Sequence, residues 1–118
     1  MVIAFIHDDF LNANGWYLRR LYADIIQRNE LDEDFKFNLY MQTDSYKFID
    51  FGDMQPDRRK KLMRMLKELA IEIIGDTDNI HQEDINSEKY QIYKEALKEL
   101  LSRIEKYENV EWPNDKKD

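Results

Sequence analysis

Four aspartates stand where apolar runs of the chain end, and carboxylates in such places could bind a metal. Asp8 and Asp9 follow the run 2–6, and Asp50 and Asp53 follow a second run. Mg²⁺ needs only one or two protein carboxylates when substrate phosphates supply its other ligands. If the four side chains share a cleft, the sequence supports a small metal-dependent hydrolase. If they point apart, that hypothesis has no basis.

Two short segments resemble metal-binding motifs but lack residues that those motifs require. Asp50-Phe51-Gly52 matches the magnesium-binding triplet of protein kinases, which also need a glycine-rich loop, and this chain has only three glycines in 118 residues. The segment 76–81 begins like a calcium loop, but Ile80 occupies a ligand position and His81 replaces the turn glycine. Without cysteine, thiolate nucleophiles and zinc–thiolate sites are excluded. We therefore expect a non-enzymatic protein without metal or cofactor.

A dense run of basic residues departs most clearly from a random distribution of charge. The chain carries 25 acids and 18 bases, a net charge of −7. Bases crowd the start of an expected helix, although the positive end of the helix dipole favours acids there. The run could contact nucleic acid, an adaptor partner or a second copy of the chain. Alternatively, it neutralises acids elsewhere or forms a solvated face, and we favour this interpretation. Its members are Arg58, Arg59, Lys60, Lys61, Arg64 and Lys67.

Acidic loops and aromatic residues complete the set of candidate contacts. The acids fall in two polar connections, which are expected to form the partner-binding surface. The first connection contains Glu30, Asp32, Glu33 and Asp34, and the second contains Asp76, Asp78, Glu83 and Asp84. Aromatic side chains are favoured at protein interfaces, and those that do not fall on an expected core stripe could anchor a partner. These residues are Trp16, Tyr17, Tyr40 and Trp112.

The elements that must position these residues follow from hydrophobic spacing. Apolar residues 2–6 predict a strand. Alternation in 35–41, a turn at 43–45 and a second run at 46–51 predict a β-hairpin. Helical spacing predicts three helices, with Pro56 in the first turn of the second, Asp53 or Gln55 as its cap and Gly75 as its C′ residue. Their expected ranges are 15–29, 56–74 and 87–108.

These elements predict an α+β fold with the order β-α-β-β-α-α, a short, mainly antiparallel sheet packed against three helices. Residues 1–110 are expected to form one domain, with a frayed tail at 111–118. No apolar run approaches the roughly 20 residues that span a bilayer, and residues 1–9 lack the features of a signal peptide. We expect a cytoplasmic protein.

The surface character suggests a function. An acidic domain is poorly suited to phosphate backbones and well suited to a basic protein, because its field accelerates their encounter. In bacteria, immunity proteins and antitoxins that plug basic nuclease toxins are commonly built this way. We therefore expect a non-catalytic inhibitor that occludes the active cleft of a basic toxin. The alternatives are an adaptor or nucleic-acid-associated protein using the basic helix 57–67, and a metal-dependent hydrolase using carboxylates.

Overall fold

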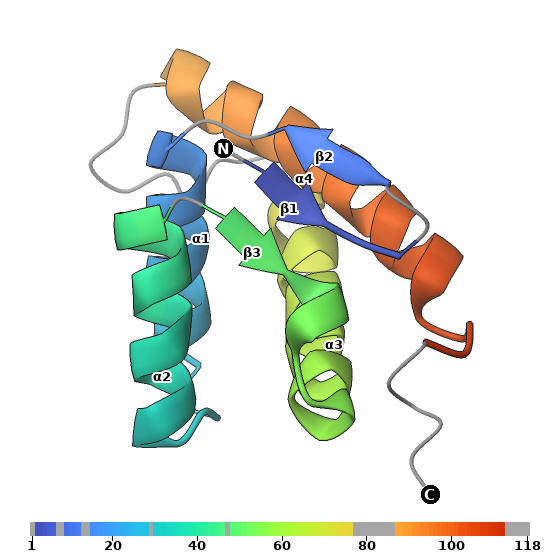
Figure 1. Ribbon diagram of the computed structural model, residues 1–118. Helices are drawn as coiled ribbons and strands as arrows, with labels where there is room; N and C mark the ends of the chain where they lie inside the picture. The colour runs from blue at the N-terminus through green and yellow to red at the C-terminus, as the bar shows by residue number, and fades with distance from the viewer. Residues whose placement is uncertain are drawn as a thin grey trace, which may run out of the picture.

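The computed structural model describes residues 2–6, 9–12, 15–28, 30–46, 48–76 and 87–112, and it confirms an α+β fold (Figure 1). Within these residues there are three short strands and four α-helices, rather than the three helices expected. A π-helical turn, Met41–Tyr46, precedes β3, and a 3-10 turn, Phe51–Asp53, follows it. The strands are β1 (Val2–Ala4), β2 (Phe10–Asn12) and β3 (Phe48–Asp50), and the helices are α1 (Gly15–Ile26), α2 (Glu33–Tyr40), α3 (Pro56–Ile74) and α4 (Ser87–Tyr107).

The sheet is mixed, with β1 in the centre, antiparallel to β2 and parallel to β3. Ile3 pairs with Leu11 and with Ile49, so these three side chains share one face, and all three are buried. Strand residues alternate between faces. Phe10 and Phe48 therefore lie on the other face, where both are exposed. One face of the sheet thus covers the core, and the other carries exposed aromatic side chains.

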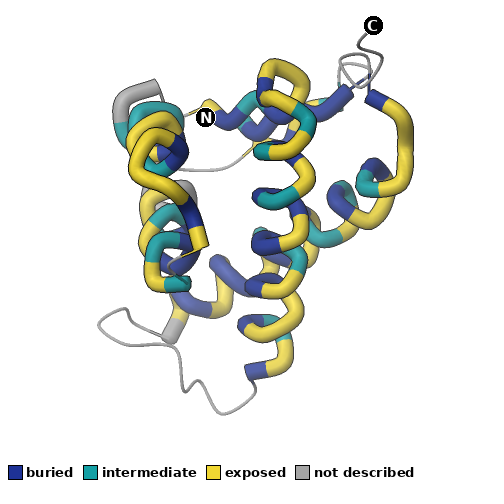
Figure 2. Tube along the Cα trace, turned by 90° about the horizontal axis from the view of Figure 1, so that it is seen from below, coloured by how far each residue is buried: buried dark blue, intermediate teal, exposed yellow. Residues whose placement is uncertain are grey.

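The helices close the core from behind and beside the sheet (Figure 1). Helices α3 and α4 pack against each other, and α1 contacts both α2 and α3. In Figure 2 the buried residues form stripes along the helices, as expected for amphipathic helices. None of the helices in the described ranges is long and apolar enough to cross a membrane.

Three tyrosines of α4 tie this helix to three separate segments through carboxylates. The Tyr90 hydroxyl donates to Asp76 at 2.6 Å, beyond the end of α3. The Tyr93 hydroxyl donates to Asp24 of α1 at 2.7 Å. The Tyr107 hydroxyl donates to Asp9 at 2.6 Å, beside the sheet. Each buried ring therefore adds a directional link to its apolar contacts.

The predicted hairpin over 35–51 is wrong, because residues 35–40 belong to helix α2. Phe35 and Leu39 are both buried, and their i,i+4 spacing places them on one helical face. The Asp32 side chain accepts a hydrogen bond from the Phe35 amide at 2.7 Å and caps the helix. The apparent alternation is coincidental, since Phe37 is exposed at 63%. Only β3 remains of the hairpin.

The long helices agree with the prediction, while several details differ. The predicted ranges 56–74 and 87–108 correspond to α3 and α4, and Pro56 begins α3 as expected. Gln55 is the N-cap but makes no side-chain capping bond. Gly75 is the C-cap with φ −77°, so it does not adopt the left-handed conformation expected of a C′ glycine. Strand β2 was not predicted, and the sheet is mixed instead of mainly antiparallel.

Candidate binding groove

The aspartates suggested for metal binding serve different parts of the structure. Asp9 accepts bonds from Tyr107 and from Arg103 Nε at 3.2 Å, and the hydrogen bond from Tyr107 lowers the pKa of Asp9. Asp50 caps the 3-10 turn by accepting from the Gly52 amide at 2.9 Å. Asp50 and Asp53 line the same depression, and Asp8 lies outside the described residues. In the described part of the chain, no three metal-ligating side chains gather.

The basic run of α3 is largely engaged within the molecule. Arg58 binds Asp34 at 2.6 Å. Arg64 binds Glu30 at 2.8 Å and also Glu68, at 2.9 Å. Lys67 binds Glu108 at 2.7 Å. These contacts favour the interpretation that the run neutralises acids elsewhere in the chain.

Arg59 is used differently, as a core residue. It is almost completely buried, and its guanidinium carbon lies 4.6 Å from the centre of the Trp112 ring. Stacking of a guanidinium on an indole is favourable when both are shielded from water. Lys60, by contrast, is exposed, and Lys61 is half-buried. A ligand of the basic run would therefore compete with contacts that already hold α3 in place.

The acidic connection that leads into α2 also makes contacts within the molecule. Besides Glu30 and Asp34, which bind α3, Asp32 caps α2 and Glu33 binds Lys36 at 3.3 Å. The hydrogen bond from Arg64 lowers the pKa of Glu30. This connection therefore joins α2 to α3. Glu33 and Asp34 remain largely exposed, and the partner-binding role of the connection stays a prediction.

The second acidic connection is described only at its start. Asp76 is buried and accepts the Tyr90 hydroxyl, and its backbone oxygen accepts a bond from Lys94. It therefore belongs to the core instead of a partner-binding surface. Asp78, Glu83 and Asp84 lie outside the described residues, so their predicted contact role stays a prediction.

Of the three expected aromatic anchors whose side chains are described, two are not at the surface. Tyr17 and Trp112 are buried, so the expectation that they anchor a partner is wrong; the Trp112 indole donates to the Tyr107 backbone oxygen at 3.1 Å. Burial of Trp112 also corrects the view that the tail frays from residue 111, while residues 113–118 are not described. Tyr40 is exposed, and nothing is described of the Trp16 side chain.

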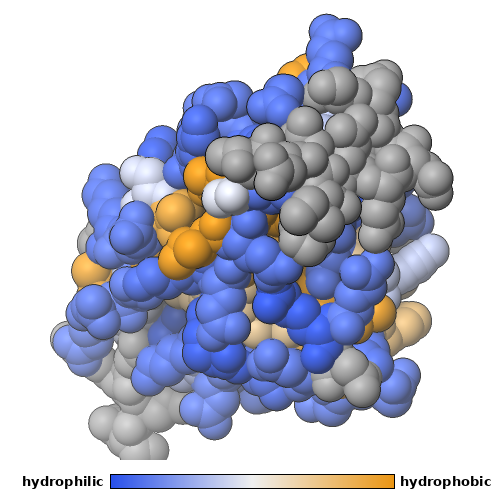
Figure 3. Space-filling view, turned by 180° about the vertical axis from the view of Figure 1, so that it is seen from behind, coloured by the Kyte–Doolittle hydropathy of each residue, from blue (hydrophilic) through white to orange (hydrophobic). Residues whose placement is uncertain are grey.

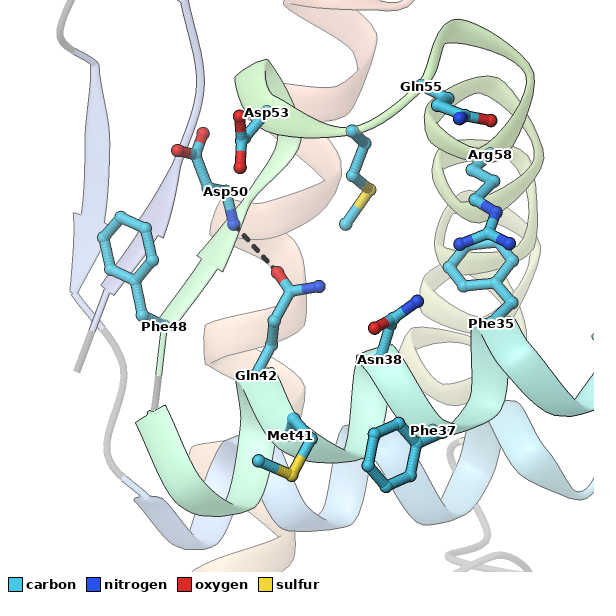
Figure 4. Close-up of a pocket in the computed structure, with 11 residues that line it drawn as sticks. Phe35, Phe37, Asn38, Met41, Gln42, Phe48, Asp50, Asp53, Gln55 and Arg58 are labelled. Atoms are coloured by element: carbon cyan, nitrogen blue, oxygen red, sulfur yellow. Dashed lines mark hydrogen bonds between the residues drawn. The ribbon is translucent and has the colours of Figure 1, made fainter.

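Two exposed aromatic residues that sequence analysis missed, Phe37 and Phe48, border a groove between α2 and β3 (Figure 4). It is open to solvent and has a volume of about 580 Å³. The first turn of α3 and the 3-10 turn complete the walls. The lining residues are Phe35, Phe37, Asn38, Met41, Gln42, Phe48, Asp50, Asp53, Met54, Gln55 and Arg58.

The two ends of the groove differ in charge. Asp50 and Asp53 stand at one end, and Arg58 stands at the other, next to Phe35 (Figure 4). The Arg58 guanidinium carbon lies 5.3 Å from the centre of the Phe35 ring. Gln42 joins the walls, because its side-chain oxygen accepts the Asp50 amide at 3.3 Å. The helical wall is therefore held against the strand.

Among the described residues, Asp50 and Asp53 lack the ion pair with a basic side chain that most other acids make. Neither carboxylate pairs with a base of the described ranges, whereas Glu30, Asp34 and Glu108 each do. Asp53 is exposed, and one Asp50 oxygen is used by the Gly52 amide. This end of the groove is suited to a positively charged group.

A second, smaller hollow of about 350 Å³ lies between α3 and the segment after α4. Arg59, Lys60, Arg64 and Lys67 line it together with Glu68 and Glu108. Most of its charged groups bind one another, as described above.

The face of the molecule seen from behind is mainly hydrophilic, with smaller apolar areas between the charged side chains (Figure 3).

Comparison with known proteins gives no relative: the chain matches no family model, no curated protein and no solved structure.

Proposed function

We propose that this protein is a non-catalytic binding module that docks on a basic protein. More specifically, we propose an inhibitor of the immunity-protein or antitoxin kind, which covers the active cleft of a basic, nuclease-type toxin. The net charge of −7 supports attraction to such a partner. Complementary charge accelerates association, and apolar contacts then slow dissociation.

The observation that carries this proposal is the internal use of the basic run. Arg58, Arg64 and Lys67 are paired with acids, and Arg59 is buried against Trp112. Binding of the run to a phosphate backbone would disrupt these contacts, which argues against the nucleic-acid alternative. The surplus acids leave a negative surface, so a cationic protein is the complementary partner.

The test is affinity capture from a native lysate of the source organism, followed by a functional assay of the captured protein. We expect one basic protein in stoichiometric amount at low salt, and much less at high salt because screening weakens the attraction. Adding the purified protein should then abolish the nuclease activity of the captured partner. Recovery of an acidic protein, or a captured nuclease that stays active, would contradict the proposal.

A further inference from the structure

We propose that the groove between α2 and β3 receives a short, extended segment of the basic partner. The segment places a lysine or arginine at Asp50 and Asp53 and apolar side chains against Phe37 and Phe48. This inference rests on the proposed function and specifies where that partner binds.

The apolar part of the argument concerns aromatic side chains that the fold holds outward. Phe37 lies between Phe35 and Leu39 on α2, and because both of these are buried, Phe37 faces away from the core, 63% exposed. On β3 the inward position belongs to Ile49, so Phe48 points to the open face and is 36% exposed. Both rings border the same groove. They stand on opposite borders of it, with Met41 and Gln42 between them (Figure 4). Apolar side chains of the segment, one against each ring, would remove both rings from water.

Met41 and Met54 add adaptable surface to the groove. The methionine side chain is flexible and polarisable, and it is common on surfaces that accept different apolar partners. Met54 is buried, while Met41 is half-buried. The groove therefore has a border of rigid aromatic rings and a lining that includes flexible methionine side chains.

The charge of the groove selects the kind of segment. Asp50 and Asp53 have no base partner among the described residues, so a cationic side chain would supply the missing counter-charge. At the other end Arg58 already binds Asp34 and stacks on Phe35. Its remaining N–H groups can still donate to a backbone carbonyl. A segment with its basic residue at the aspartate end and a carbonyl at the Arg58 end fits both.

The polar lining between these ends favours an extended backbone. Asn38 and Gln42 each carry an amide that can donate and accept, and both line the groove. The Gln42 oxygen binds the Asp50 amide, which leaves its NH₂ group as a donor. An extended chain exposes its own N–H and C=O groups, whereas a helix satisfies most of them internally. Side-chain amides in the groove are therefore more useful to an extended segment.

Two short synthetic peptides serve as probes, one of alternating leucine and arginine and one of alternating leucine and glutamate. We expect the arginine peptide to shift the backbone amide NMR signals of Asn38, Gln42 and Phe48, and the glutamate peptide to leave them unchanged. Affinity is measured by fluorescence anisotropy of the labelled peptides at low salt. Each of Asp53→Lys and Phe37→Ala should weaken binding of the arginine peptide about tenfold, which is about 1.4 kcal/mol.

Matched control variants distinguish an effect of the groove on peptide affinity from an effect of the net charge of the protein. Glu105→Lys changes the net charge as much as Asp53→Lys does, and Ile92→Ala removes an exposed apolar side chain as Phe37→Ala does. Both control residues are exposed on α4, and neither lines the groove. The controls should change affinity by no more than about twofold.

The possible results distinguish the two proposals. If the arginine peptide binds but Asp53→Lys and Phe37→Ala act no more strongly than their controls, the groove is not the docking site, and the acidic binding module stands. If the arginine peptide binds no better than the glutamate peptide, the proposed preference for a basic partner is refuted, and this inference falls with it.

Discussion

Replacing Tyr93 by phenylalanine is expected to lower the free energy of unfolding by about 2 kcal/mol. The change removes one hydroxyl and keeps the ring, so the packing against Tyr17, whose ring centre is 5.6 Å away, is preserved. The lost bond ends on Asp24, and hydrogen bonds to charged groups contribute roughly 1.5–3 kcal/mol. The Asp24 side chain is only 9% exposed, so water cannot readily replace the hydroxyl.

Two features keep the expected cost within that range. Arg20 Nε still binds Asp24 at 3.1 Å, so the carboxylate is not left without any partner. Tyr107→Phe provides a matched comparison, because Asp9 is 20% exposed and keeps Arg103 and Lys106 nearby. We expect about 1 kcal/mol or less for Tyr107→Phe, since both ion pairs and water remain.

The assay is urea unfolding followed by circular dichroism, with the slope of the unfolding free energy against urea concentration unchanged in both variants. A double-mutant cycle of Tyr93→Phe with Asp24→Asn should show a coupling energy of about 1 kcal/mol. If Tyr93→Phe costs no more than Tyr107→Phe, then burial of the carboxylate does not determine the strength of these links, and the reasoning fails.

Three further predictions follow from the same contacts. Burial and the adjacent carboxylates raise the pKa of Tyr90 and Tyr93, so their contribution to stability is complete below the unfolded-state pKa of about 10 and is lost as the pH rises further. The tyrosinate absorbance of these two residues, taken as the difference from the Tyr90→Phe and Tyr93→Phe variants, should increase together with unfolding, not before it. Arg64→Met should lower the melting temperature at low salt, and this difference should vanish in roughly 1 M salt, because its partner Glu30 is exposed. Asp32→Ala should cost about 1 kcal/mol in urea unfolding while Asp32→Asn remains close to wild type, as expected for a helix cap; equal effects of the two would contradict the cap.

The Asp32 contact also affects the choice of charge-reversal variants for a test of partner binding. Reversing Asp32 and Asp34 to lysine would remove the α2 cap and the ion pair with Arg58, so it would disturb folding as well as surface charge. Asp53 is the better site for charge reversal, since it is exposed and has no partner in the described ranges. The structure thus moves the test of partner binding from the acidic connection to the groove.

The sequence by itself determined the long helices and the α+β class. Each long helix repeats its apolar spacing over several turns, and α3 also carries Pro56 in its first position, so several independent signals agree. The composition excluded cysteine chemistry, and the charge pattern identified the basic run as unusual. These properties depend on composition or on residues close together in the chain.

Only the tertiary structure decided what residues 35–41 and the charged residues do. The alternation of Phe35, Phe37 and Leu39 is compatible with a strand, but the i,i+4 pair Phe35 and Leu39 is equally compatible with a helix. In the folded chain, the helix is favoured because it buries Phe35 and Leu39 together against the core. Arg58 and Arg64 reach Asp34 and Glu30 across separations of 24 and 34 residues. No local pattern encodes such partners, because they meet only when the chain has folded.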